Sequence, residues 1–399
     1  MRRYTFFLML LVLMVSLAAC SSKEKEGTNA ANEETSTNKE TEDTENESNV
    51  FSTKNVTRVD TNNLVDAAVK ISKTIWPATQ EDNKPGTVIL APADQWQVSL
   101  ASTDLIHHPN NGPVLFYEGE DVSEKTLNEL KRLAPLGNIE GTEVMVVGNA
   151  GQQIFDLLKD YSVDVIEGEG SAEFAKKVDQ KYAEVAGELP QSVIIVSSEN
   201  EAKLFSLIAA NWIAHMPEPV LFVTKDDIPN ATKKALELRD KKANIYILGP
   251  ESVISANVEN QLKEFGVVTR IQGETPTETS IEFAKFKDED TKFGWGLTEP
   301  GHGLAFISTE NAEFAIAGAP FAHLGKHAPL IWLDKGELLD ETHEFLGQLQ
   351  PTFTDDPTVG PYNHAYIIGS EQAITMETQG MIDQMLEIIG ADGGRHGGH

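Results

Sequence analysis

The chain has 399 residues with 32 basic and 62 acidic side chains, so its formal net charge at pH 7 is −30. A chain this acidic is unsuited to direct binding of nucleic acid or of anionic lipid headgroups, which attract basic surfaces. Because Cys20 is the single cysteine, the chain can form neither an internal disulfide nor a thiolate metal cluster.

The chain begins with the pattern of a secretion signal. Arg2 and Arg3 precede an apolar run over residues 6–15 that is too short to span a bilayer as a mature helix. Leu17-Ala-Ala-Cys20 follows and resembles the lipobox of bacterial lipoproteins, in which the cysteine is lipidated and becomes the new N-terminus. We therefore predict a lipoprotein signal peptide over residues 1–20, with lipid attachment at Cys20. The protein would lie on the outer face of the cytoplasmic membrane, facing the cell wall.

Residues 21–54 have the composition of a disordered segment. Ser, Thr, Asn, Glu and Lys dominate, and the first aromatic residue is Phe51. Such a segment cannot bury enough apolar surface to offset the conformational entropy lost on folding. We predict a disordered acidic tether that holds the folded part away from the membrane.

The rest of the chain repeats one pattern of strands and helices three times. A proline followed by an apolar strand occurs at Pro113, Pro219 and Pro329, at spacings of 106 and 110 residues. Continuous apolar strands that alternate with amphipathic helices are typical of parallel sheets covered on both faces. The predicted class is α/β, with three tandem parallel-sheet modules over residues 55–165, 166–271 and 272–390. A flexible tail follows over residues 391–399.

Equivalent charged residues recur near the module boundaries. Arg58 and Arg270 stand in matching short strands, and Val165 takes this place in the second copy. Eight residues after each of these positions an acid opens a helix, and these acids are Asp66, Glu173 and Glu278. An acid near a helix N-terminus interacts favourably with the helix dipole, whereas a position used three times can also be an inter-module or ligand contact. We favour helix stabilisation and treat the two arginines and three acids as candidate contacts.

Polar residues also follow the first predicted strand of each module. They are Asp94, Glu199, Asn200, Glu310 and Asn311. Ligands of open α/β sheets bind at the carboxyl ends of the strands, so these side chains are a candidate ligand edge for a sugar or a metal ion. The same residue types cap helices, and we favour capping.

Histidines supply one further candidate. His323 and His327 are four residues apart, a spacing that on one helix face allows zinc binding together with a third ligand. Gly325 and Pro329 crowd this segment, which also suits a helix end where histidine interacts favourably with the dipole. The sequence therefore predicts no metal site, and it marks these two histidines as the residues to examine.

No motif indicates catalysis. The sequence has no G-x-G-x-x-G after a strand, no G-x-x-x-x-G-K-[ST], no G-x-S-x-G and no H-E-x-x-H. The three repeated units occupy nearly all of the chain after the tether, so we predict that the protein is not an enzyme and has no resident cofactor.

Several of these motifs resemble the cell-wall-binding repeat type 2 family of Gram-positive surface proteins. The matching segments are Tyr246–Gly249, Val268–Gly273 and Glu278–Ser280, and the order and triplication of the unit extend the similarity over roughly residues 55–390. The resemblance implies three Rossmann-like modules in a compact intramolecular pseudo-trimer, attached non-covalently to anionic wall polymers. This chain lacks the family's Asp-Arg-Tyr triplet, which residues 63–65 and their counterparts replace.

Together these features predict a non-catalytic, lipid-anchored envelope protein that binds cell-wall polymer or another envelope protein and meets the membrane only through its anchor. Because the chain is acidic, attraction to a polyanion requires a local basic patch or a bridging divalent cation. Two alternatives stay open, a solute-binding lipoprotein associated with a transporter and a metal-binding surface protein. A solute-binding protein would have a single deep pocket and would be stabilised by its solute.

Overall fold

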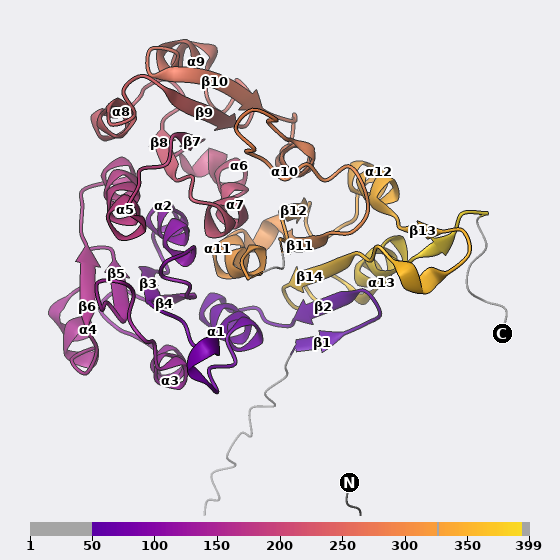
Figure 1. Cartoon of the computed structure of the whole chain (residues 1–399), viewed down its shortest axis with the longest axis horizontal. Coiled ribbons are helices and arrows are strands. Elements are labelled where there is room, and N and C mark those ends of the chain that lie inside the picture. The colour runs from indigo at the N-terminus through magenta and orange to yellow at the C-terminus, as the bar shows by residue number, and fades with distance from the viewer. Residues whose placement is uncertain (1–49, 325–326, 393–399) are drawn as a thin grey trace, which may run out of the picture. The chain divides into compact units, whose positions relative to one another are not determined.

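A computed structural model describes residues 50–324 and 327–392 (Figure 1). The predicted signal peptide, Cys20, nearly all of the predicted tether and the end of the tail lie outside these residues. No helix in the described part of the chain has the length and hydropathy needed to cross a membrane.

The first two sheets have the same topology of four parallel strands. The first has the order β4-β3-β5-β6 and the second the order β8-β7-β9-β10. Their strands are β3 (Val88–Pro92), β4 (Val114–Tyr117), β5 (Val144–Val147), β6 (Val163–Ile166), β7 (Ser192–Ser197), β8 (Val220–Val223), β9 (Ala243–Leu248) and β10 (Gly266–Ile271). In each sheet the fourth strand in chain order lies at one edge.

The third sheet reaches the same arrangement by using a strand from the beginning of the folded part. Its order is β1-β2-β14-β11-β12, with β1 antiparallel to β2 and the other neighbours parallel. The strands are β1 (Val50–Ser52), β2 (Val56–Val59), β11 (Gly303–Ser308), β12 (Leu330–Leu333) and β14 (His364–Ile368). The segment from residue 55, which we predicted to open the first module, therefore completes the third sheet. The predicted boundary at residues 165 and 166 falls within β6.

Helices cover both faces of the sheets. They are α1 (Leu64–Ile75), α2 (Trp96–Ser102), α3 (Glu124–Leu133), α4 (Gln152–Leu157), α5 (Ser171–Ala186), α6 (Lys203–Ser206), α7 (Ala209–His215), α8 (Asn230–Glu237), α9 (Ala256–Leu262), α10 (Pro276–Lys285), α11 (Phe314–Gly318), α12 (Asp340–Leu349) and α13 (Met376–Met385). Short 3-10 helices are η1 (Glu81–Asn83), η2 (Thr103–Ile106), η3 (Asn200–Ala202), η4 (Thr309–Asn311), η5 (Ala319–Ala322) and η6 (Pro357–Val359). A small additional sheet pairs β13 (Thr352–Phe353) with β15 (Ile389–Gly390). The predicted α/β class with parallel-sheet modules is confirmed.

Three helices interlock the modules in a cycle (Figure 1). After β2 of the third sheet, α1 packs on β4 of the first sheet. In the same way α5 follows β6 and packs on β8, and α10 follows β10 and packs on β12. Each sheet is thus covered by a helix that directly follows a strand of another sheet, and one hydrophobic cluster includes residues of all three modules.

The local sequence explains where these elements lie. The strands β7 and β8 are buried along their whole length, as expected for parallel strands covered on both faces. At the start of α10, Thr275 and Glu278 form a capping box around Pro276, whose fixed φ and missing N–H suit the first helical position. The indole of Trp332 in β12 is fully buried and donates to the Leu204 carbonyl at 2.8 Å, which links the third module to the second.

Candidate functional site

The two arginines that we predicted as candidate contacts donate hydrogen bonds to backbone carbonyl groups within the fold. Arg58 is fully buried and donates to the Gly369 carbonyl at 2.9 Å. Arg270 makes the equivalent bond to the Gly249 carbonyl at 2.7 Å, and both guanidinium groups also donate to a carbonyl of the following turn, at 2.8 and 2.9 Å. Because a buried carbonyl without a donor is costly, these contacts stabilise the end of the neighbouring strand.

The three predicted acids occupy the third position of their helices. Asp66 in α1 pairs with Lys70 at 2.8 Å, and Glu278 in α10 forms the capping box with Thr275. Glu173 in α5 accepts a hydrogen bond at 3.3 Å from a backbone N–H of the preceding turn. Each interaction is that of an acid at the positive end of a helix. The structure brings Glu173, but neither of the other two acids, into the pocket described below.

The predicted ligand-edge residues follow β3, β7 and β11, which belong to three separate sheets. Glu199 accepts from the Lys225 backbone N–H at 3.0 Å, and Asn200 accepts from the indole of Trp96 at 3.0 Å, which joins the first two modules. Asp94 is exposed. The remaining two residues of this group, Glu310 and Asn311, belong to η4. Glu199 stands at the N-cap of η3 without a side-chain cap bond, and the cap of η4 is Ser308. The side-chain bonds described for this group are thus local bonds of Glu199 and one inter-module bond of Asn200.

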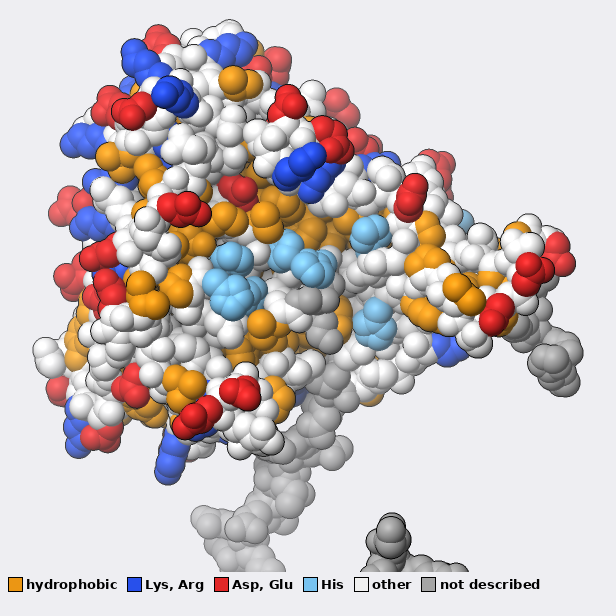
Figure 2. Space-filling model, viewed as in Figure 1, with side chains coloured by type: hydrophobic (Ala, Val, Ile, Leu, Met, Phe, Trp, Pro, Cys, Tyr) orange, Lys and Arg blue, Asp and Glu red, His pale blue; other side chains and the backbone are white. Residues whose placement is uncertain are grey.

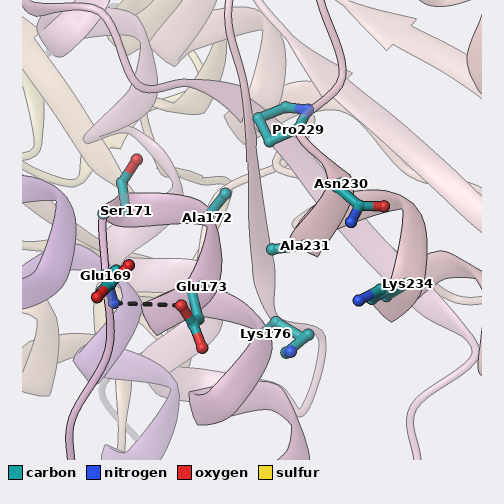
Figure 3. A pocket seen from close by; sticks show the side chains of 10 residues that line it. Glu169, Ser171, Ala172, Glu173, Lys176, Pro229, Asn230, Ala231 and Lys234 are labelled. Carbon is teal, nitrogen blue, oxygen red and sulfur yellow. Dashed lines mark hydrogen bonds between the residues drawn. The ribbon is translucent and has the colours of Figure 1, made fainter.

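A pocket of about 420 Å³ lies where α5 and α8 begin, and we call it the α5–α8 pocket (Figure 3). Its lining comes from segments 169–176 and 229–234. The N-cap positions of the two helices are Gly170 and Pro229, and neither supplies a side-chain cap. The first N–H groups of both helices therefore have no side-chain acceptor at the cap, and both positive helix ends border the same pocket.

Two lysines and two acids supply the formal charges of the α5–α8 pocket. Figure 3 shows Lys176 and Lys234 on the two helices that border it, with Glu169 and Glu173 beside them on the α5 side. Within residues 50–324 and 327–392, neither lysine ammonium has a hydrogen bond or an ion pair. The pocket can therefore offer two ammonium groups and two helix ends to an anionic group. Sequence reasoning identified Glu173 but missed both lysines.

A second cavity, of about 360 Å³, lies at the amino ends of β11 and β14. Its described lining consists of glycines, histidines and tyrosines, and these residues are Gly301, His302, Gly303, His327, Tyr362, His364 and Tyr366. The described residues around it carry neither a carboxylate nor an ammonium group. This cavity therefore gives no comparable reason to expect an anionic ligand.

Five histidines from all three modules meet in what we call the histidine junction. They are His107 and His108 after η2, His215 at the end of α7, and His323 and His327 after η5. Figure 2 shows histidine side chains gathered on one face of the molecule. The shared helix face considered for the last pair is wrong, because η5 ends before His323 and that residue is extended. Among the residues described, no three His, Cys, Asp or Glu side chains are arranged to hold a metal ion.

This chain is similar in sequence to one curated protein and in fold to two solved structures. No family model matches this chain. A curated relative, "Amidase enhancer" of Bacillus subtilis (strain 168), is 24% identical over 205 residues, which are 50% of this chain and 26% of that protein. Among solved structures, Cwp6 from Clostridium difficile has a TM-score of 0.68 at 16% identity, covering 84% of this chain and 48% of the other. Cwp8 from Clostridium difficile has a TM-score of 0.63 at 17% identity, covering 83% and 52%. The chain thus shares its fold with about half of each of these structures and matches about a quarter of the curated relative.

Proposed function

We propose that this protein is a non-catalytic envelope protein that attaches to an anionic polymer of the cell wall through the α5–α8 pocket. The observation that carries the proposal is the meeting of two helix N-termini, without side-chain caps, and two lysines without ion pairs in one pocket. Phosphate and carboxylate groups bind at such helix ends, because the N–H groups point outward and the dipole favours negative charge. The rest of this acidic chain repels a polyanion, so binding depends on this local site.

The carboxylates of the same pocket suggest how a divalent cation would strengthen attachment. Glu169 and Glu173 lie on the α5 side, with the Glu169 N–H bonded to a Glu173 carboxylate oxygen. Calcium ions prefer carboxylate and other oxygen ligands and accept them in flexible geometry. In our proposal one cation binds these carboxylates and an anionic group of the polymer, while Lys176 and Lys234 bind the next anionic group.

The sequence and the related proteins support the location that this function requires. Leu17-Ala-Ala-Cys20 after a short apolar run supports lipid attachment at Cys20 and a place on the outer face of the cytoplasmic membrane. The similarity to a protein called an amidase enhancer supports a role at the cell wall in which another protein performs the catalysis. The fold that the chain shares with Cwp6 and Cwp8 is compatible with this role.

The proposal is tested by co-sedimentation of residues 21–399 with purified Gram-positive walls. Walls with and without their anionic polymers are compared, each with calcium or with a chelator. We expect binding that requires the polymers and weakens when calcium is removed. Binding to walls stripped of anionic polymer would contradict the proposal, and so would the absence of binding under every condition. In that last case the search would move to envelope protein partners.

A charge-reversal pair tests whether the α5–α8 pocket is the binding site. Lys176→Glu with Lys234→Glu should weaken polymer binding by about tenfold or more, because several favourable charge contacts worth tenths of a kcal/mol to ~1 kcal/mol each become unfavourable. Lys241→Glu with Lys242→Glu is the matched control, since it makes the same net change at two exposed lysines in the turn before β9. Equal weakening by both pairs would show that net charge matters and the pocket does not.

A further inference from the structure

We propose that His107, His215 and His323 of the histidine junction and two buried acids beside it, Asp104 and Glu218, form a pH-compensated contact that keeps the three modules joined while these five groups are uncharged. This contact lies apart from the α5–α8 pocket, and the inference does not depend on wall binding.

The histidines contact one another across the module boundaries. His323 of the third module lies 5.7 Å from His107 and 5.3 Å from His108 of the first module, measured between ring centroids. His327 of the third module lies 4.5 Å from His215 of the second, and Nδ1 of His327 is 3.0 Å from Nε2 of His215. Protonation of neighbouring rings would place like charges within these distances.

The groups that face the five histidines offer no negative charge to balance such protonation. His107 Nδ1 is 3.0 Å from the hydroxyl of Tyr182, and His323 Nε2 is 2.9 Å from Oδ1 of Asn111. After the neighbouring His327 and His107, the ammonium of Lys287 also lowers the pKa of His215. In the described part of the chain no carboxylate bonds to any of the five histidines.

Burial and mutual repulsion therefore favour the neutral imidazole at His107, His215 and His323. Burial, with a smaller contribution from His108, lowers the pKa of His107 from its usual 6.5 to about 4. Burial and the neighbouring His327 lower the pKa of His215 to about 4. The pKa of His323 falls to about 3, mainly through burial and secondarily through the other histidines. These rings stay neutral in the folded protein at pH values where they are protonated in the unfolded chain.

The two acids show the opposite effect in the same part of the molecule. Asp104 in η2 is fully buried, and among the described residues neither of its oxygens has a hydrogen-bond partner. Burial raises the pKa of Asp104 well above its usual value, and the carboxylates of Asp179 and Glu218 add to the shift, whereas the nearby Arg239 opposes it. This environment favours the protonated, uncharged form of Asp104 in the folded protein.

Glu218 precedes β8 and accepts a hydrogen bond from the indole of Trp212 at 2.9 Å. Burial raises the pKa of Glu218 from 4.5 to about 7, against the lowering effects of that bond and of the positive charge of Lys287. Glu218 therefore contributes a second protonated acid below about pH 7.

The three histidines and the two acids change the stability of the folded protein in opposite directions over the same pH range. The depressed histidine pKa values give stability that is present above pH 6.5 and is lost as pH falls towards 4 and 3. The raised Glu218 pKa gives stability that is present below pH 4.5 and is lost as pH rises through 7, and Asp104 acts in the same direction. Between about pH 4.5 and 6.5 the two acids thus offset part of the effect of the three histidines, so these groups remain uncharged and the modules remain joined.

The proposal is tested by urea unfolding of the whole protein between pH 4.5 and 6.5, comparing each variant with the parent. In this range one such group changes the unfolding constant by about tenfold per pH unit. Acidification should raise the unfolding constant of His107→Asn less steeply than that of the parent, by about tenfold per pH unit. The amide of the new side chain can replace Nδ1 of the histidine. Acidification should raise the unfolding constant of Glu218→Gln more steeply than that of the parent, by about tenfold per pH unit. The glutamine keeps an acceptor for the indole of Trp212.

His343→Asn on α12 is the control, because this side chain is exposed and does not belong to the junction. The pH profile of this variant should be parallel to that of the parent. Parallel profiles for His107→Asn and Glu218→Gln as well would overturn the proposal, as would slopes that change in the same direction. Hydrogen exchange gives an independent measurement. Acidification of Glu218→Gln should release protection first in segments 103–108, 209–215 and 319–323, and uniform loss of protection would contradict a junction that controls module contact.

Discussion

The same pair of helix starts occurs at three places in this molecule, and only one of them is suited to bind an anion. In the α5–α8 pocket neither helix has a side-chain cap. At the equivalent place where α1 meets α3, Asn63 and Ser123 cap the two helices, and Lys125 lies 3.6 Å from Asp66. Where α10 and α12 begin, a capping box closes one helix and two acids stand in the first turn of the other. We infer that the modules share a fold but not a ligand.

The contacts that hold each helix pair together differ as well. Asp179 of α5 and Arg239 after α8 form a fully buried ion pair with two bonds, at 2.8 and 3.0 Å. At the position equivalent to Asp179, α1 has Ser72, which donates to Glu129 of α3 at 2.5 Å. The third counterpart, Ala284 in α10, is a buried apolar residue. The helix pair around the pocket is thus joined by the strongest directional contact of the three, which fixes the spacing of its two lysines.

The largest expected effect comes from removing that ion pair. Asp179→Ala should lower the free energy of unfolding by about 3–5 kcal/mol, because it leaves the Arg239 charge buried without its partner. Ser72→Ala removes a single hydrogen bond at the equivalent position and should cost about 1–3 kcal/mol, since Arg132 still satisfies Glu129. Urea unfolding at neutral pH measures both. Equal costs would mean that the two helix pairs are held equally strongly.

The repeated fold could be predicted from sequence because its signals are local. The apolar strand after each proline and the matching places of Arg58 and Arg270 mark equivalent elements without any knowledge of packing. The pairing of β2 with β14 could not be predicted, because one short apolar strand carries no information about its neighbour in the sheet. This is why residues 55–59 were assigned to the first module, whereas they lie in the third sheet.

The candidate sites were harder to predict because they depend on contacts between modules. His107 and His323 both stand six residues before a strand proline, but only the packing of the modules brings their rings together. Lys176 and Lys177 are adjacent in α5, yet Lys177 pairs with Glu173 at 3.3 Å while Lys176 lines the pocket. Sequence alone does not distinguish these two lysines.

An intermediate effect is expected if the charge pattern of α8 is transferred to α12. Asp340→Asn with Glu344→Lys gives α12 the residue types of Asn230 and Lys234, because both pairs stand at the same distance from their strand prolines. Removing negative charge from the positive end of a helix opens it to an anion, so wall-polymer binding should rise by about two- to fivefold. Co-sedimentation at several salt concentrations measures the gain. No gain would show that the shape of the α5–α8 pocket matters more than its charge.

The smallest expected effect comes from supplying the missing cap of α8. Pro229 stands at its N-cap with an extended backbone, a conformation that aspartate adopts readily, so Pro229→Asp should place a carboxylate on the first N–H groups of the helix. Stability should rise by up to about 1 kcal/mol, reduced by the greater freedom of the unfolded chain without proline. Polymer binding should fall severalfold, because the new carboxylate occupies the helix end that the polymer would use. Thermal unfolding measures the gain in stability, and co-sedimentation measures the loss of polymer binding. A variant that gains stability and still binds walls fully would show that the polymer does not use the α8 helix end.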